Sequence, residues 1–307
     1  SFILTVMKKD LIVICVPLFN EADNILNVVD DIDSYIENTA FSKFYDFNVI
    51  FYNDGSTDNT SEIIQNNSSH RLISSPTNKG LGHAIDCLFF EAKKLNPKGV
   101  IKLDGDNQMN VNEIDNFLNH EKNTQLDVIY GNRFKSSKKY KMPLFRKIGS
   151  IFFKYLLSVY SLKINDPTNG FIYVSRRYLE DYKIFGSYNA AQQILIDAKL
   201  RKLLVGEVEV SLIQRSTGRS FIGIKYPLIV ISNILILTLY RSSVKFLLVP
   251  GILGLLLGSF LLIYDIFLWA TRRSDLIITN YVLFLFLIGG FQLVILSILF
   301  EFIKNKK

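Results

Sequence analysis

The pattern of apolar and polar residues along the chain changes once, near residue 220. Before that point, short apolar runs alternate with segments whose apolar residues recur every three or four positions, as in strands that alternate with helices. After it, the apolar runs continue for whole helix lengths. The pattern therefore predicts an α/β domain followed by helices that are apolar on all sides.

The apolar runs of the first part predict the strands of a mostly parallel sheet. Residues 11–16 are apolar without a break, which suits a strand buried on both faces. Residues 24–36 follow with apolar positions at helical spacing. Further strands are expected at 47–52, 71–74, 100–103, 127–130, 171–175 and 205–213, and further helices at 112–120, 143–159 and 189–202 and ending near 66 and 95. This alternation predicts a doubly wound α/β domain, in which Ser56 or Thr57 caps the second helix.

Two apolar segments near the C-terminus are long enough to cross a membrane. They cover residues 246–270 and 277–303, and the short gap between them predicts a hairpin. Residues 227–240 are apolar nearly all round but too short to span, so we expect them to lie in the membrane interface. Arg241, Lys245 and Lys304 flank the outer ends of the two spans. The positive-inside rule then places both chain ends in the cytoplasm.

Composition agrees with a cytoplasmic domain attached to a membrane. The chain has 307 residues and a net charge of +7. Its mean hydropathy of +0.23 is high for a soluble protein, and the apolar excess lies in the last third. We interpret Cys15 and Cys87 as reduced core residues, because they fall in an expected strand and an expected helix. Residues 1–6 precede Met7, no secretory signal is expected, and the domain is taken to begin at residue 7.

Two carboxylates follow the apolar run 100–103, where a buried strand would end. Asp104 and Asp106 are one residue apart, so in an extended segment both side chains point the same way. Gln108 adds an amide oxygen. Oxygen ligands of this kind suit Mg²⁺ or Mn²⁺, with the remaining positions left to water and phosphate. The same tripeptide is also common in turns, so the metal interpretation depends on the other motifs.

The segment after residue 134 is basic and then amphipathic. Residues 135–141 hold four lysines. In the expected helix 143–159, aromatic and aliphatic residues stand beside Arg146 and Lys147. Such a helix suits a membrane surface, but a helix that packs on a protein core shows the same pattern. Both interpretations stay open on these residues.

Seven motifs in a fixed order make the chain resemble the family 2 glycosyltransferases of the GT-A fold. They are VPLFNE at 16–21, NDGSTD at 53–58, NKGLG at 78–82, DGDNQ at 104–108, GNR at 131–133, DPTNGF at 166–171 and RSTGRS at 215–220. The chain is most similar to polyisoprenyl-phosphate glycosyltransferases, namely the dolichol-phosphate mannose synthase group and bacterial undecaprenyl-phosphate glucosyltransferases. The latter often carry two C-terminal membrane helices. The resemblance implies a GT-A domain at 7–225, a juxtamembrane helix at 226–245, two transmembrane helices at 246–303 and a cytoplasmic tail at 304–307.

The resemblance also implies roles for single residues. The nucleotide-sugar donor would contact Pro17, Phe19, Glu21, Asp54, Lys79, Asp104, Gly105, Gln108, Arg133 and Arg215. Asp104, Asp106 and Gln108 would hold Mg²⁺ or Mn²⁺, which neutralises charge on the departing diphosphate. Arg146 and Arg219 would bind the acceptor phosphate. Asp166 and Asp106 would be the catalytic residues.

The sequence departs from the family pattern at a few positions. Phe221 stands where members often have a lysine, and Ile172 stands where many have an arginine. Bacterial glucosyltransferases often have an aspartate in place of Gly170. Gln192 and Gln193 replace an acidic residue that is often found in that helix. These departures concern the acceptor and the sugar, and they leave the fold and the donor site as the family has them.

The resemblance implies transfer of a hexose from a UDP- or GDP-sugar to a polyprenyl phosphate, with inversion, for cell-envelope glycans. A polyprenyl phosphate is already a good nucleophile, so the enzyme mainly positions it and shields charge. A transferase that acts directly on a glycan or lipid-linked saccharide is an alternative, and it would need a base such as Asp166. Asp166 would otherwise orient the attacking phosphate or only cap its turn.

The membrane segments and the carboxylate pair argue against two other classes of function. A membrane-tethered scaffold that binds nucleotide sugars without catalysis is a further alternative, against which the intact pair Asp104 and Asp106 argues. A transporter is disfavoured, because neither span carries a charge at its centre. We expect an integral protein of the bacterial inner membrane with a cytoplasmic catalytic domain and no nucleic-acid partner. A homo-oligomer stays open.

Overall fold

The chain forms two compact units, Ser1–Ile234 and Leu235–Lys307, and each is described by itself. The structure, a computed structural model, describes residues 9–134, 144–188, 190–211, 226–271 and 281–305. Within helices it leaves out the side chains at 144–147, 226–227, 243–245 and 304–305.

The first unit is built on a mixed sheet whose described strands have the order β3-β2-β1-β4-β6-β5-β7. The strands are β1 (Asp10–Leu18), β2 (Tyr45–Asn53), β3 (Arg71–Ser74), β4 (Gly99–Lys102), β5 (Val128–Asn132), β6 (Ile172–Ser175) and β7 (Val205–Glu209). β6 runs antiparallel to its neighbours β4 and β5, whereas the other printed pairs are parallel. This sheet confirms the predicted doubly wound, mostly parallel GT-A domain.

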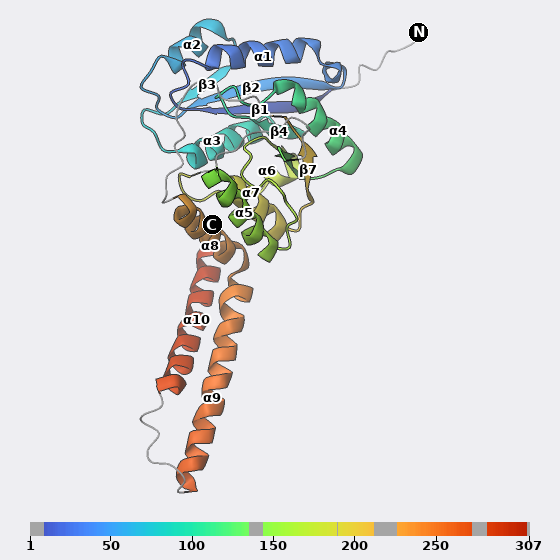
Figure 1. Cartoon of the computed structure of the whole chain (residues 1–307). Helices are drawn as coiled ribbons and strands as arrows, with labels where there is room; N and C mark the ends of the chain where they lie inside the picture. The colour runs from blue at the N-terminus through green and yellow to red at the C-terminus, as the bar shows by residue number, and fades with distance from the viewer. Residues whose placement is uncertain (1–8, 135–143, 189, 212–225, 272–280, 306–307) are drawn as a thin grey trace. The chain divides into compact units, whose positions relative to one another are not determined.

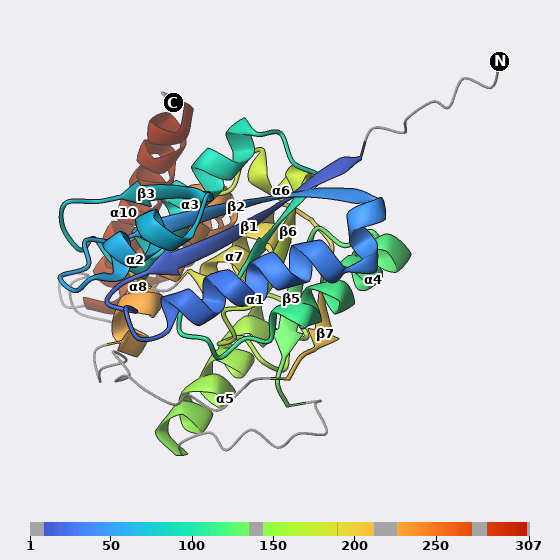
Figure 2. The ribbon, with the colours of Figure 1, turned by 90° about the horizontal axis from the view of Figure 1, so that it is seen from above.

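Helices cover both faces of the sheet. The helices of this unit are α1 (Ile25–Asn38), α2 (Thr60–Asn67), α3 (Leu81–Lys94), α4 (Ile114–Thr124), α5 (Leu144–Val159), α6 (Arg176–Leu179) and α7 (Ala191–Leu200), with 3-10 turns at Ala40–Lys43 and Val111–Glu113. A further helix, α8 (Tyr226–Ser243), begins in the first unit and ends in the second. Figure 1 shows α1 and α2 on one side of the sheet and α3, α6 and α7 on the other. Figure 2 shows α1 lying across the strands on the side nearer the viewer.

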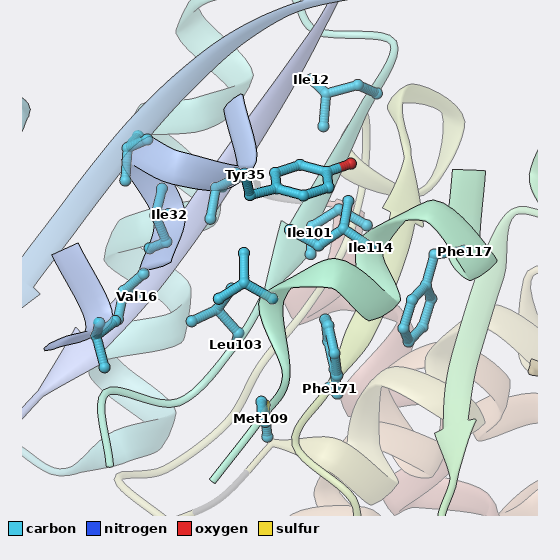
Figure 3. Packing of buried hydrophobic residues seen from close by; sticks show 14 of the residues in the cluster. Ile12, Val16, Ile32, Tyr35, Ile101, Leu103, Met109, Ile114, Phe117 and Phe171 are labelled. Carbon is cyan, nitrogen blue, oxygen red and sulfur yellow. The ribbon is translucent and has the colours of Figure 1, made fainter. Parts of the chain in front are cut away.

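β1 is buried on both faces, as its apolar run predicts. Ile12 and Val16 belong to the main hydrophobic cluster, together with residues of α1 and α4 such as Ile32 and Phe117 (Figure 3). On the opposite face, the Cys15 thiol donates to a main-chain carbonyl of α3 at 3.9 Å. Alternate side chains of one strand therefore serve two layers of helices.

Two local predictions for the first unit are corrected. The helix expected to start at Ser56 or Thr57 begins at Thr60 instead. Asn59 stands at the N-cap position without a side-chain cap bond, and the Asp58 carboxylate accepts hydrogen bonds from the N–H (3.1 Å) and the hydroxyl (2.5 Å) of Thr60. β1 also continues past residue 16, because Pro17 and Leu18 keep their register with β2.

The second unit holds two long apolar helices, α9 (Val249–Ala270) and α10 (Tyr281–Asn305), preceded by a π-helical turn at Val244–Leu248. Segments Phe246–Ala270 and Tyr281–Ile303 are long and apolar enough to cross a membrane, with mean hydropathies of 2.5 and 2.7. The helices approach closely at Gly258, where an added Cβ would lie 2.8 Å from the Leu287 side chain. The expected start of the second span at 277 lies outside the described residues.

Candidate active site

The loops that follow β1 and β2 are joined by hydrogen bonds at the carboxyl edge of the sheet. Parallel pairing sets Leu18 opposite Asn53, so the two strands end side by side. The Asn20 N–H donates to Ser56 Oγ (2.9 Å), and Asn20 Oδ1 accepts from the Thr57 N–H (2.8 Å). Asn20 has a φ of 55°, a left-handed conformation that asparagine tolerates. The predicted donor loops 16–21 and 53–58 therefore form one structure.

A second set of bonds ties the start of α1 to the start of α2. The Glu21 N–H donates to Thr60 Oγ1 (2.9 Å), and the Ala22 N–H donates to Asp58 Oδ2 (3.2 Å). Burial raises the pKa of Asp58, but hydrogen bonds from Thr60 and Ala22 outweigh it, so this pKa lies below its ordinary value. The charged carboxylate is thus the form that joins the loops. The Glu21 carboxylate accepts from Asn24 Nδ2 at 2.7 Å.

Asp54 holds the loop that leads into α3. Its side chain is buried, and its two oxygens accept from the N–H groups of Lys79 (2.9 Å) and Gly80 (2.7 Å). Gly80 has a φ of 92°, which favours glycine. The structure therefore brings together the predicted donor residues Asp54 and Lys79, through the Lys79 backbone. Contact of Asp54 with a nucleotide base stays a prediction.

β4 ends in the predicted metal site and contains a buried lysine. The Lys102 side chain is 2% exposed, and its ammonium donates to Asp104 Oδ1. The Asp104 side chain is 33% exposed. Gly105 packs against the Leu18 side chain, where a Cβ would collide. The first carboxylate of the motif is thus held at one oxygen and open to solvent in part.

Asp106 and Gln108 complete the oxygen-bearing group. Asp106 Oδ1 accepts from the Gln108 N–H (3.3 Å), and the turn between them passes through Asn107 with a φ of 55°. Among the described residues no three His, Cys, Asp or Glu side chains form a complete metal site. Two carboxylates and one amide fit a divalent ion that takes its remaining ligands from substrate phosphates and water. The chemistry of the donor set therefore fits Mg²⁺ or Mn²⁺ bound together with a diphosphate.

β6 carries the motif 166–171 to this site. It pairs with both β4 and β5, so Ile172 lies opposite Lys102 on one side and opposite Tyr130 on the other. Asn169, which precedes the strand, donates from Nδ2 to the Gly131 carbonyl (2.8 Å). The antiparallel strand is therefore what joins the motifs 104–108, 131–133 and 166–171.

Arg133 and Asp166 form a buried two-point ion pair. Nε of Arg133 donates to Oδ2 of Asp166 (2.6 Å) and Nη2 donates to Oδ1 (2.7 Å), and the Arg133 N–H adds a bond to Oδ2 (3.0 Å). Asp166 is 0% exposed. Nη2 also donates to Thr168 Oγ1 (2.9 Å). The buried Asp166 carboxylate holds Arg133 by this pair, and its predicted catalytic role stays a prediction.

The geometry can now be compared with known proteins. The family model described as glycosyl transferase family 2 matches residues 13–183, which is more than half of the chain. The chain belongs to this family. It is therefore a glycosyltransferase, as the seven motifs indicate.

This glycosyltransferase is similar to other proteins that are named as sugar transferases, and to solved structures of one such enzyme. It is 28% identical over 230 residues to a UDP-N-acetylglucosamine–dolichyl-phosphate N-acetylglucosaminyltransferase of Methanococcus voltae, covering 67% of this chain and 87% of that protein. It is 26% identical to a dolichyl-phosphate beta-glucosyltransferase of Trichomonas vaginalis, covering 64% and 61%. Glucosyl-3-phosphoglycerate synthase of Mycobacterium tuberculosis, solved with Mn²⁺ and UDP-glucose, has a TM-score of 0.56 at 16% identity and covers 76% and 79%. That structure shows the likeness of fold.

Two residues of the glycosyltransferase site were missed by the sequence reasoning. Glu207 of β7 accepts from the N–H groups of Asn165 (2.6 Å) and Asp166 (2.9 Å), and so supports the turn that carries Asp166. The pairing of β5 with β7 places Glu207 beside this turn. Because the two strands are far apart in the sequence, no local sequence pattern indicates this contact. Lys102 did leave a signal, since it is one charged residue inside an otherwise apolar run.

The two glutamines of α7 hold main-chain groups. Gln192 is buried and donates from Nε2 to the Pro167 carbonyl (3.0 Å). Gln193 donates to the Phe185 carbonyl and accepts from the Phe185 N–H, both at 2.9 Å. Where other family members often have an acidic residue, this glycosyltransferase therefore has amides that brace the site loops.

Helix α5 combines the two interpretations of its sequence. Phe153 and Leu157 are buried, so one face packs on the core. Ile148, Tyr155 and Val159 are among its exposed apolar residues. Packing of one face on the core is therefore confirmed, whereas contact of the exposed apolar face with a membrane surface stays a prediction.

Other predicted site residues are placed in part or not at all. Pro17 is buried in β1, and Phe19 follows the strand half-buried. Arg215, Arg219, Phe221 and the lysine cluster 135–141 lie outside the described residues, and so does the side chain of Arg146. The phosphate-binding roles of Arg146, Arg215 and Arg219 stay predictions.

Proposed function

We propose that this glycosyltransferase transfers a hexose from a UDP- or GDP-sugar to a polyprenyl phosphate, with a divalent metal and with inversion at the sugar. The observation that carries the proposal is the pair Asp104 and Asp106 at the end of β4, where Asp104 stays partly exposed beside donor loops already fixed by their own hydrogen bonds. The names of the dolichyl-phosphate relatives support the acceptor class.

The donor would lie across the carboxyl edge of the sheet. Asp104, Asp106 and Gln108 would hold Mg²⁺ or Mn²⁺, which when bound neutralises charge on the departing diphosphate. Pro17, Phe19, Glu21 and Asp54 would surround the nucleoside, and Lys79, Gly105, Arg133 and Arg215 the diphosphate side. The chain's own part is to orient the donor and keep its reacting carbon facing the acceptor.

The environment of Asp166 supports an acceptor that is already an anion. A hydroxyl acceptor needs a base, but Asp166 is enclosed by the Arg133 guanidinium and has no exposed surface. A phosphate oxygen needs no such base at neutral pH. Arg146 and Arg219 are proposed to bind that phosphate, because a guanidinium matches its oxygens in pairs.

Attachment to a membrane would bring the lipid acceptor to the site. The two long apolar helices and the exposed apolar face of α5 support this attachment. We propose an integral protein of a bacterial inner membrane with the catalytic domain and both termini in the cytoplasm. A reporter fused after Lys307 that signals from the far side of the membrane would overturn this topology.

The test is to incubate membranes containing the full chain with a panel of labelled UDP- and GDP-sugars and then extract the lipids. We expect label in an acid-labile lipid fraction for one donor class, and loss of label with EDTA or Asp106→Asn. Asp46→Asn, which changes a carboxylate on the exposed surface, is the matched control. Label in glycan without a lipid intermediate would support direct transfer, and no transfer from any donor would support the scaffold.

A further inference from the structure

Lys102 is an unusual residue for the centre of this sheet. β4 is buried along its whole length, with Ile101 and Leu103 in the cluster beneath α1 and α4 (Figure 3). Lys102 alternates to the other face of the sheet and lies between Cys15 of β1 and Ile172 of β6. An ammonium placed there cannot reach bulk water, so it needs a charged partner.

That partner is the first carboxylate of the metal motif. Within the described part of the chain, the Lys102 ammonium bonds Asp104 Oδ1 and no other group. Asp104 keeps its second oxygen, Oδ2, on the side of Gly170. The pair is therefore tied together at Oδ1, while Oδ2 lies against Gly170 and the Asp104 side chain is 33% exposed.

Gly170 keeps the space beside this pair free of side-chain atoms. A Cβ at residue 170 would lie 2.5 Å from Asp104 Oδ2 and 2.8 Å from Lys102 Nζ. Both are closer than a carbon atom can approach without displacing its neighbours. The Lys102–Asp104 pair therefore packs directly against the backbone of Gly170, and a side chain at this position would displace it.

The charge count of the site follows from this arrangement. Asp104 and Asp106 together carry two negative charges, and Lys102 cancels one of them. Attraction for a divalent ion scales with the charge it meets, so the site by itself holds the ion less strongly than two carboxylates would. A nucleotide diphosphate brings the missing negative charge and further oxygen ligands.

We propose that Lys102 is a positioning residue that fixes Asp104 through Oδ1 and makes divalent-metal binding depend on the nucleotide diphosphate. The inference deepens the proposed function and rests on it for the identity of the donor. Metal and nucleotide then bind as partners, and each raises the affinity for the other.

The test measures Mn²⁺ binding to the full purified chain in detergent, from the electron paramagnetic resonance signal of free Mn²⁺, without nucleotide. Binding of UDP and GDP is measured separately with and without Mn²⁺. In the wild type, saturating Mn²⁺ should raise nucleotide affinity by about tenfold or more. Lys102→Met and Lys102→Gln should each bind Mn²⁺ about tenfold more tightly than the wild type in the absence of nucleotide.

The two variants and one control separate charge from simple structural support. Lys102→Gln keeps a donor for Asp104 but removes the charge, so wild-type Mn²⁺ affinity in this variant would overturn the charge role. Lys98→Met changes the lysine at the other end of β4, which bonds Glu121 (3.2 Å), and should leave Mn²⁺ affinity unchanged. Melting temperatures of all variants are recorded, because a purely structural lysine would change these alone.

Failure of the inference and failure of the proposed function give different results. If the wild type binds Mn²⁺ tightly without nucleotide and UDP or GDP does not change this affinity, the inference is overturned. This result needs no variant, so it can be obtained even if a variant does not fold. Nucleotide-coupled Mn²⁺ binding with unchanged Lys102 variants overturns the inference alone. No Mn²⁺ binding under any condition, with transfer that resists EDTA, overturns the metal-dependent function itself.

Discussion

Asp104 and Asp166 are both carboxylates paired with a cation at the carboxyl edge of the sheet, but their surroundings differ. Asp104 accepts from the ammonium of Lys102 and is 33% exposed. Asp166 is enclosed by the Arg133 guanidinium and is 0% exposed. Both were predicted to belong to the site from the same kind of motif.

The difference teaches which carboxylate is free to meet a ligand. A carboxylate has four lone-pair positions, and those of Asp166 face a guanidinium, a backbone N–H and a hydroxyl. Asp104 Oδ2 lies against the backbone of Gly170, and the Asp104 side chain is 33% exposed. We therefore propose that Asp104 contacts the ligand and that Asp166 supports the site, and the predictions below test this division.

The largest expected effect is on transfer when the open carboxylate pair is changed. Asp106→Asn removes one of the proposed metal ligands at a partly exposed position and should lower kcat/KM by about 10³-fold, or about 4 kcal/mol, with an unchanged melting temperature. Steady-state transfer to lipid checks this, with Asp46→Asn as control. Wild-type rates from Asp106→Asn, or full turnover in EDTA, would remove the metal from the mechanism.

The closed pair should respond through stability. Asp166→Asn leaves the Arg133 guanidinium buried without its charge partner and should reduce the free energy of unfolding by about 3 kcal/mol. Urea unfolding followed by circular dichroism measures the loss. An unchanged melting temperature together with a kcat lowered by about 10²-fold would instead restore Asp166 as the catalytic residue.

Gly170→Ala tests whether the close contact between residue 170 and Asp104 matters for activity. The new methyl carbon would lie 2.5 Å from Asp104 Oδ2, so the carboxylate or the turn must shift. We expect kcat to fall by about tenfold and stability to fall by about 1–2 kcal/mol. Gly149→Ala is the matched control, since a Cβ there meets nothing within 4 Å. Equal activity of the two variants would show that the space at residue 170 has no part in the reaction.

Glu207 offers a smaller change to the support of Asp166. Glu207→Gln keeps an acceptor for the Asn165 and Asp166 N–H groups but removes the charge that strengthens both bonds. The free energy of unfolding should fall by about 1 kcal/mol. Chemical denaturation compares this variant with Glu209→Gln, the next glutamate of β7. Equal stabilities of the two variants would contradict a special role for Glu207.

The smallest expected effect is the pH dependence of the hydrogen bonds that Asp58 accepts from Ala22 and Thr60. The pKa of Asp58 in the folded chain lies below its ordinary value of 3.8, since hydrogen bonds to the charged form outweigh burial. The contribution of Asp58 to the free energy of unfolding is therefore fully present at pH values above this ordinary pKa. It is lost as the pH falls through the lower pKa of the folded chain. Asp58→Asn should be less stable than the wild type at pH 7, and the difference should shrink in stronger acid. A difference that grows in acid would contradict the sign of the shift.

The sequence by itself determined the elements that depend on neighbouring residues. The two-faced burial of β1, the strand at 71–74 and the two long apolar helices follow from local hydrophobic period and length. The metal-binding role of Asp104, Asp106 and Gln108 stays a prediction. Its argument from strand alternation is corrected, because β4 ends at Lys102 and residues 105–107 form a turn. The cap of α2 was wrong because Ser56 and Thr57 are used by Asn20 of another loop.

Only the tertiary structure decided how the predicted site residues divide their work. The insertion of β6 between β4 and β5 brings Gly170 against Asp104, although 65 residues lie between these positions in the sequence. The partners of Asp166 include Arg133, which directly follows β5, and Glu207 of β7, and the partner of Lys102 is Asp104 of the motif itself. A motif gives a side chain's chemical type, whereas its exposure and its ion pair depend on contacts between strands far apart in the chain. Those contacts make one predicted carboxylate open to a ligand and enclose the other.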